Sequence, residues 1–181
     1  MNIANLVTIS RVLLVPLIVL VYYSSMPFSQ LIAAVLFTLA SITDWLDGFL
    51  ARRLNQLSAF GAFLDPVADK LLVVMALVLL TANYPGPWFV IPTAIIIARE
   101  VFVSALREWM ASRNLRDVVA VGFVGKVKTT VQMIAIIVLL AYTPALPVLI
   151  LYSGYFLLYL SAALSLWSMI IYLKKALPVL R

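Results

Sequence analysis

One stretch decides how this chain folds: TDWLDGFLARR at residues 43–53, followed by FGAFLDPVADK at residues 60–70. It holds four of the seven acidic residues in the sequence. Asp44 and Asp47 are three positions apart and Asp65 and Asp69 are four apart, so each pair shares one face of a helix. The short link between the segments predicts two antiparallel neighbouring helices. We therefore expect the four carboxylates to converge near one end of both helices.

The convergence of four carboxylates points to metal ions. Carboxylates a few ångströms apart cannot all stay ionised, because their repulsion and desolvation would raise their pKa values. Two divalent cations balance four negative charges, and all-oxygen ligation favours Mg²⁺, Mn²⁺ or Ca²⁺. Paired metal ions serve phosphoryl transfer. The alternative is that these aspartates only form ion pairs with Arg52, Arg53 and Lys70. Four aspartates in two pairs, each at a helical spacing, instead favour a functional site.

The composition places this site in a membrane protein. Apolar residues make up 65% of the 181 residues, whereas soluble domains have about 45–50%. The absence of Cys and His excludes disulfides, Ser-His-Asp triads and His-ligated zinc. The net charge of +6 suits anionic lipids and phosphate-bearing substrates, and basic residues also hold loops in the cytoplasm.

The hydrophobic pattern predicts an all-α integral membrane protein, with one transmembrane catalytic domain over residues 1–181. Each expected span has about the 17–25 residues that cross ~30 Å of hydrocarbon. Prolines at 27, 85, 87, 144 and 147 mark the breaks. The uncharged loops lie on one side and the basic residues on the other, which predicts both termini in the cytoplasm. The six expected transmembrane helices are Leu6–Tyr23, Gln30–Leu50, Gly61–Thr81, Trp88–Ala111, Val118–Ala141 and Val148–Leu173.

The aspartate stretch resembles the signature of the CDP-alcohol phosphotransferases position by position. The resemblance extends over nearly the whole chain, and no signature residue departs from it. Outside the aspartate stretch, the segments that also resemble the family are Asn5–Arg11, Ala98–Glu100, Ala105–Trp109 and Gly125–Thr130.

The resemblance implies the family fold, a site and a reaction. It assigns two Mg²⁺ or Mn²⁺ ions to the four aspartates and makes Asp69 the general base. It also assigns Gly48, Arg52 and Gly61 to CDP binding. The implied reaction joins the lipid CDP-diacylglycerol to sn-glycerol 3-phosphate, releasing CMP at the cytoplasmic face of the bacterial inner membrane. A homodimer is also implied.

The phosphate of the acceptor needs cationic partners. The candidates are Arg99, Arg107, Lys126 and Lys128. Three of them have a simpler interpretation: Arg99 in a buried ion pair, and the two lysines in topological retention or snorkelling. Lys126 and Lys128 are two positions apart, so they do not share a helix face.

Other functions stay open from the sequence. The same chemistry with another acceptor, such as inositol phosphate, serine or phosphatidylglycerol, would use the same aspartates. An ion-coupled transporter would bind cations with carboxylates near mid-membrane, between broken helices. A non-enzymatic scaffold would not need the acidic cluster. We expect the enzyme, with glycerol 3-phosphate as acceptor.

Overall fold

The computed structural model describes residues 3–54, 59–113 and 123–180, although the side chains near several helix ends, including those at positions 44–54 and 59–66, lie outside the description. Helices are the only regular secondary structure in the described part of the chain, which has no strands. Its helices are α1 (Ile3–Tyr22), α2 (Ser29–Leu54), α3 (Ala59–Asn83), α4 (Pro87–Ser112), α5 (Phe123–Ala141) and α6 (Val148–Leu180).

The six apolar segments expected from the sequence all form helices. The prolines at positions 27, 85 and 144 lie between helices, as expected from their missing N–H donor and fixed backbone angle. Two helices end well beyond their predicted last residues: α2 continues to Leu54 and α6 to Leu180. The predicted first residues of the fifth helix, 118–122, lie outside the described residues.

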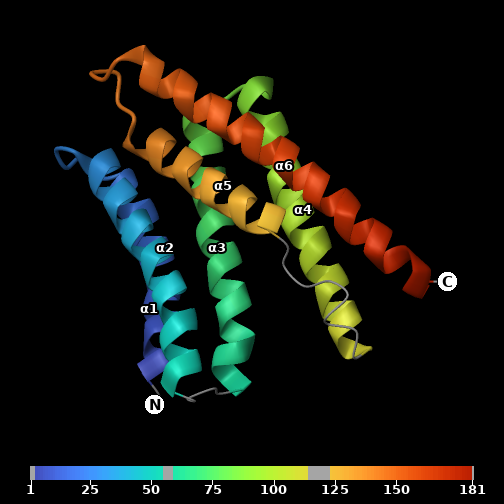
Figure 1. Cartoon of the computed structure of the whole chain (residues 1–181). Helices are drawn as coiled ribbons and strands as arrows, with labels where there is room; N and C mark the ends of the chain where they lie inside the picture. Colours follow the sequence, from blue (N-terminus) through green and yellow to red (C-terminus); the bar gives the residue numbers. More distant parts are fainter. Residues whose placement is uncertain (1–2, 55–58, 114–122, 181) are drawn as a thin grey trace.

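The helices form a bundle in which chain neighbours are not always packing neighbours. α1 packs against both α2 and α3, α5 packs against α6 and α2, and α4 packs against α6. The three uncharged connections, α1–α2, α3–α4 and α5–α6, lie toward one end of the bundle (Figure 1). The C-terminal end of α2 and the N-terminal end of α3 lie together at the other end (Figure 1). The aspartate stretch is therefore far from the uncharged connections.

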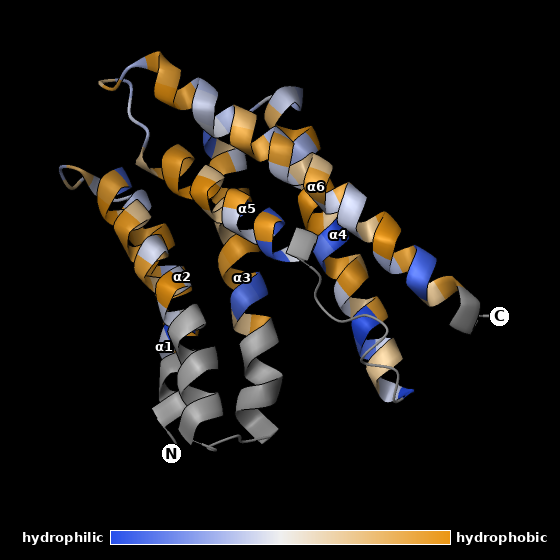
Figure 2. Ribbon diagram, in the orientation of Figure 1, coloured by the Kyte–Doolittle hydropathy of each residue, from blue (hydrophilic) through white to orange (hydrophobic). Residues whose placement is uncertain are grey.

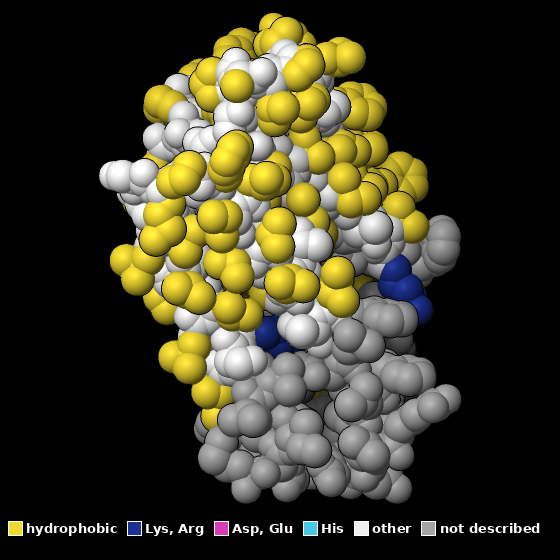
Figure 3. Space-filling view, turned by 90° about the vertical axis from the view of Figure 1, so that its left-hand side faces the viewer, with side chains coloured by type: hydrophobic (Ala, Val, Ile, Leu, Met, Phe, Trp, Pro, Cys, Tyr) yellow, Lys and Arg dark blue, Asp and Glu magenta, His cyan; other side chains and the backbone are white. Residues whose placement is uncertain are grey.

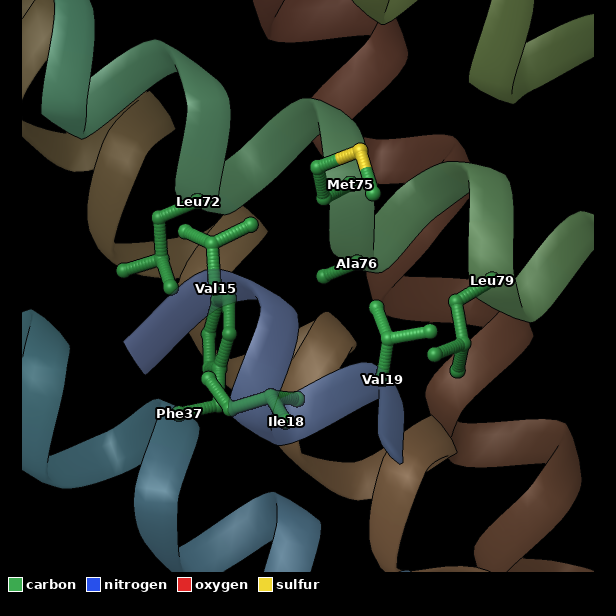
Figure 4. A pocket seen from close by; sticks show the side chains of 8 residues that line it. All are labelled: Val15, Ile18, Val19, Phe37, Leu72, Met75, Ala76 and Leu79. Atoms are coloured by element: carbon green, nitrogen blue, oxygen red, sulfur yellow. The ribbon is translucent and has the colours of Figure 1, made fainter. Parts of the chain in front are cut away.

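The core between α1, α2 and α3 is apolar. Val15 and Ile18 of α1, Phe37 of α2, and Leu72 and Ala76 of α3 are all buried. With Val19, Met75 and Leu79 they line a small pocket (Figure 4). This packing holds α3, which carries Asp65 and Asp69, in register with α1.

An aromatic cluster anchors the α3–α4 turn at the uncharged end. Tyr84 packs against Phe89 and Tyr155, with ring centroids 5.4 and 6.0 Å away. Its hydroxyl donates a hydrogen bond of 3.3 Å to the backbone carbonyl of Leu139. Burial raises the pKa of Tyr84 to about 12, so this phenol stays protonated at neutral pH.

The exterior of the bundle is also apolar. Within the described residues, α4 and Val148–Leu177 of α6 are long and apolar enough to cross a membrane. Hydrophobic side chains predominate on the described part of one face (Figure 3). Hydrophilic stretches lie toward the C-terminal ends of α4 and α6 and the N-terminal end of α5 (Figure 2). This distribution indicates a membrane protein, because large exposed apolar faces need apolar surroundings.

Candidate active site

Two helices carry the four aspartates. Asp44 and Asp47 lie in α2, and Asp65 and Asp69 lie in α3. Because α2 continues to Leu54 and does not end at Leu50, the first pair lies further from the end of its helix than the sequence predicted. α2 and α3 contact each other, so their backbones run close enough for facing side chains to meet.

Most of the predicted metal site lies outside the described side chains. This holds for Asp44, Asp47 and Asp65, and also for the predicted CDP-binding residues Gly48, Arg52 and Gly61. Among the side chains that the structure does describe, no group of three His, Cys, Asp or Glu residues comes together. The donor set fits divalent cations by its chemistry, since carboxylate oxygens are the ligands that Mg²⁺ and Mn²⁺ prefer.

Asp69 is the signature aspartate whose surroundings are described. It is partly buried, two residues after the exposed Val67 and next to the buried Ala68. Its negative charge attracts the ammonium of Lys128 on α5. The predicted general base is therefore within electrostatic reach of one of the four predicted acceptor cations.

Lys128 belongs to a buried polar cluster that joins three helices. Its ammonium forms an ion pair with the carboxylate of Glu100 on α4. The guanidinium of Arg99 lies 3.3 Å from the same Glu100 oxygen, and donates a hydrogen bond of 2.8 Å to the Ser168 hydroxyl on α6. Arg99, Lys128 and Ser168 are all buried. The cluster thus places two cations and one anion between α4, α5 and α6.

The four predicted acceptor cations separate into two environments. Arg99 and Lys128 lie inside the cluster, whereas Arg107 and Lys126 are exposed. Lys126 and Lys128 point to different sides of α5, as their spacing of two predicts. The buried ion pair considered for Arg99 is present, with Glu100 as its partner.

Sequence reasoning did not identify several buried polar residues on the helices that form this cluster. Ser161, Ser165 and Ser168 are buried on α6, and Gln132 is buried one turn after Lys128 on α5. The guanidinium of Arg99 also lies 5.9 Å from the ring centre of Tyr172. Polar residues at helical spacing within an apolar helix are the signal that predicts such a buried seam, because each needs a partner away from lipid.

Arg11 is a further buried cation that the site prediction did not include. It is 2% exposed, on the same face of α1 as Val15 and Ile18. Val15 lies beside Leu72 of α3 (Figure 4). The two helices run in the same direction (Figure 1). Arg11 lies one turn before Val15 on α1, and the turn that contains Asp69 lies one turn before Leu72 on α3. The register of α1 and α3 therefore brings a buried positive charge to the level of Asp69.

Comparison with known proteins identifies the family. The family model described as CDP-alcohol phosphatidyltransferase matches residues 1–170. The chain belongs to this family. It is also similar to CDP-diacylglycerol–glycerol-3-phosphate 3-phosphatidyltransferase from Escherichia coli K12 and from Shigella sonnei, with 52% identity over 175 residues. The identity to the protein of the same name from Salmonella choleraesuis is 51%. Each alignment covers 97% of this chain and 94% of the relative.

Membership of the CDP-alcohol phosphatidyltransferase family confirms the resemblance found in the aspartate stretch. The matched region, 1–170, includes α1 to α5 and most of α6. All residues predicted to bind metal, CDP or the acceptor lie within it, and so does the buried cluster around Glu100.

Proposed function

We propose that this chain transfers the phosphatidyl group of CDP-diacylglycerol to sn-glycerol 3-phosphate, forming phosphatidylglycerophosphate and CMP. The observation that carries the proposal is the 52% identity, over nearly the full length of both chains, to a relative that bears the name of this transferase. Family membership independently supports a CDP-activated alcohol as the donor. The enzyme is therefore a phospholipid-synthesising transferase.

Two divalent cations, Mg²⁺ or Mn²⁺, would be held by Asp44, Asp47, Asp65 and Asp69. Their spacings on α2 and α3 and the contact between the two helices support this assignment. When bound, the ions would neutralise negative charge on the diphosphate of the donor. Gly48, Arg52 and Gly61, on the same two helices, would bind the CDP part of the donor, with Arg52 offering a planar fork to a phosphate oxygen.

Asp69 would act as the general base. A hydroxyl of glycerol 3-phosphate is a poor nucleophile at neutral pH, and a positioned carboxylate can take its proton as it attacks. The hydroxyl oxygen forms a bond to the β-phosphorus of CDP-diacylglycerol while the bond from that phosphorus to the bridging oxygen breaks. The electron pair of the broken bond leaves with CMP. No covalent enzyme intermediate is required.

The acceptor's phosphate would be bound by cations from α4 and α5. Arg107 and Lys126 are exposed, so a soluble acceptor can reach them, and the charge of Lys128 is attracted by that of Asp69. Arg99 is already committed to Glu100 and Ser168. We therefore propose Lys128, Lys126 and Arg107 as direct phosphate partners, and Arg99 as a cation that adds positive potential nearby.

The enzyme would cross the inner membrane six times, with its active site facing the cytoplasm, and would act as a homodimer. Support for this topology comes from the three uncharged connections at one end of the bundle and the basic helix ends away from them. The acyl chains of the donor would stay in the bilayer, and water-soluble glycerol 3-phosphate would enter from the cytoplasm.

CMP release by the detergent-purified protein tests the reaction and the acceptor together. CDP-diacylglycerol and Mg²⁺ or Mn²⁺ are supplied, with glycerol 3-phosphate, inositol phosphate, serine or phosphatidylglycerol offered separately. We expect release only with glycerol 3-phosphate. Release with another acceptor would support the proposed transfer reaction but contradict glycerol 3-phosphate as the acceptor. No release from folded, metal-supplied protein would contradict the proposed activity and favour a binding or transport role.

A further inference from the structure

The connection between α1 and α2 holds Phe28 in an unfavourable backbone conformation. Its φ is 62°, the one positive φ of a non-glycine residue in the described part of the chain. Two backbone hydrogen bonds fix this turn: the N–H of Ser29 donates to the carbonyl of Met26 over 3.3 Å, and the N–H of Ile32 donates to the carbonyl of Phe28 over 2.9 Å. At a positive φ, Gly or Asn costs less than a bulky side chain. The turn itself therefore gives no reason for a Phe at this position.

Packing within the chain gives no reason for Phe28 either, because the residue is 77% exposed. Its neighbours Tyr23 and Met26 are 64% and 60% exposed, and the connection carries no charge. Three large side chains thus project from one short loop at the uncharged end of the bundle (Figure 1). A residue that opposes its local backbone preference without a packing gain marks a position with another role. The contact that favours Phe28 therefore lies outside this chain.

Exposed apolar stripes on α1 and α2 both lead to this connection. The stripe consists of Leu31, Val35, Leu39 and Ile42 on α2, and of Leu13, Leu17 and Leu20 on α1. Spacings of three and four place Phe28 on the same side as the first stripe, and Tyr23 on the same side as the second. In a membrane protein such stripes face hydrocarbon. Phe28 and Tyr23 therefore lie where the lipid-facing surface of these two helices ends.

The chemistry of the loop fits the boundary between lipid tails and head groups. Tyr23 has an apolar ring and a polar hydroxyl, the combination that is enriched at this depth. An edge contact with the buried ring of Tyr22, with centroids 5.6 Å apart, holds it in place. Because the loop is uncharged, no ionised group has to lose its water when the loop enters the boundary. At the same end of the bundle, α4 begins with the exposed Trp88, another residue typical of membrane boundaries.

We propose that Phe28, with Tyr23 and Met26, inserts into the lipid leaflet opposite the aspartates and anchors the α1–α2 connection there. Burial of the Phe28 ring in lipid offsets the cost of its backbone conformation. The anchor also sets the depth of α2. Asp47 follows Phe28 by 19 positions, which is about 28 Å along a helix and close to the ~30 Å of hydrocarbon. An anchor at one boundary thus holds Asp47 near the other; this consequence rests on the proposed function, whereas the anchor itself does not.

Spin labels on single introduced cysteines measure the depth of the loop. The chain has no Cys, so each variant has one labelling site. Met26→Cys reports on the loop while Phe28 is retained, Val35→Cys is the lipid reference, and Ser112→Cys, exposed at the hydrophilic end of α4 (Figure 2), is the aqueous reference. In phosphatidylcholine vesicles, oxygen concentrates in lipid and a polar nickel complex stays in water. We expect oxygen to relax the Met26 label, as it does the Val35 label; relaxation by nickel, as at Ser112, would overturn the anchor.

Two changes at Phe28, each combined with the Met26 label, test whether this residue is the anchor. Phe28→Asn suits the positive φ but removes the apolar ring, so the label should lose its preference for oxygen. Phe28→Leu stays apolar and should retain that preference. The melting temperature in detergent confirms that both variants are folded.

Two results would contradict an anchor in lipid. One is a Met26 label that responds identically in the Phe28→Asn and Phe28→Leu variants. The other is spin–spin broadening of the Met26 label that disappears on dilution with unlabelled protein, because a second copy of the chain would then cover the loop. The measurements contain no substrate and no divalent cation, so their outcome is independent of the proposed reaction. Failure to release CMP would contradict that reaction and leave the anchor intact.

Discussion

The guanidinium of Arg99 on α4 and the hydroxyl of Ser168 on α6 are joined by a buried hydrogen bond of 2.8 Å. The same hydroxyl donates a hydrogen bond of 2.9 Å to the backbone carbonyl of Ser165. Ser168 can therefore accept from Arg99 while its own proton is used within α6. This relationship ties a buried charge on one helix to the backbone of another.

Ser168→Ala should lower the stability of the protein. The change leaves a guanidinium nitrogen of Arg99 buried without this acceptor, which costs roughly 1–3 kcal/mol. Thermal unfolding in detergent measures the effect as a lower melting temperature. Ser161→Ala is the matched control, because within the described residues the buried Ser161 hydroxyl bonds to the carbonyl of Leu158 in its own helix. Equal losses in the two variants would contradict a special role for the Arg99–Ser168 bond.

Asp69→Asn should abolish turnover and leave a folded protein. The amide cannot take a proton from the acceptor hydroxyl, and loss of a general base typically costs about 10²–10⁴-fold in rate. CMP release measures turnover, and the melting temperature reports folding. The exposed Glu108, changed to Gln, controls for the removal of a carboxylate. Substantial turnover by Asp69→Asn would remove its role as base.

Lys126→Ala should raise the KM for glycerol 3-phosphate more than the KM for the lipid. Lys126 is exposed near the start of α5, where a soluble phosphate can reach it. We expect a rise of about threefold to tenfold, because solvent screens an exposed ammonium. Steady-state kinetics with each substrate varied in turn provide the test. The exposed Lys174 on α6, changed to Ala, is the control, and equal effects on both substrates would argue against an acceptor role for Lys126.

Chelation of divalent cations should stop the reaction reversibly. With four carboxylates in the proposed site, the diphosphate of the donor would meet net repulsion once the balancing ions were removed. We expect CMP release to fall below about a hundredth of its starting rate in excess EDTA, and to return when Mg²⁺ or Mn²⁺ is added. Turnover that persisted in excess chelator would contradict the two-ion proposal.

The sequence predicted the helices well because their signal is local. Apolar runs of sufficient length and prolines at positions 27, 85 and 144 are enough to define the elements, and the structure confirms all six helices. The last residues predicted for α2 and α6 come too early in the chain. Both helices continue through charged residues, Arg52 and Arg53 in α2 and Lys174 and Lys175 in α6. Charged residues continue a helix readily.

The buried cluster shows what a sequence pattern cannot give. Arg99, Lys128 and Ser168 are distant in the chain, so their meeting depends on which helices pack together and in which register. The pattern identified Arg99 and Lys128 as candidates, yet it could not show that Glu100 pairs with both. The same holds for Arg11, whose burial depends on how α1 packs against its neighbouring helices.

Gly154→Val should destabilise the contact between α5 and α6. Gly154 is buried on α6, and a Cβ at this position would lie 2.7 Å from Cδ2 and 2.8 Å from Cγ of Leu139, and 3.3 Å from Cγ1 of Val138. Leu139 is completely buried and cannot turn away without displacing other core residues. Overpacking of this kind costs about 1–3 kcal/mol, which exceeds the few tenths of a kcal/mol that Val gains over Gly in helix propensity.

Thermal unfolding in detergent measures this loss, and Ser153→Val is the control. Ser153 precedes Gly154 in the chain and is exposed, so the same branched side chain meets no buried neighbour there. We expect a clear fall in melting temperature for Gly154→Val and little change for Ser153→Val. Small residues allow helices in a membrane to approach closely, and dispersion contacts supply the attraction. Equal melting temperatures for the two variants would mean that α5 and α6 can move apart at no cost, which would contradict the close packing that holds Lys128 in the cluster.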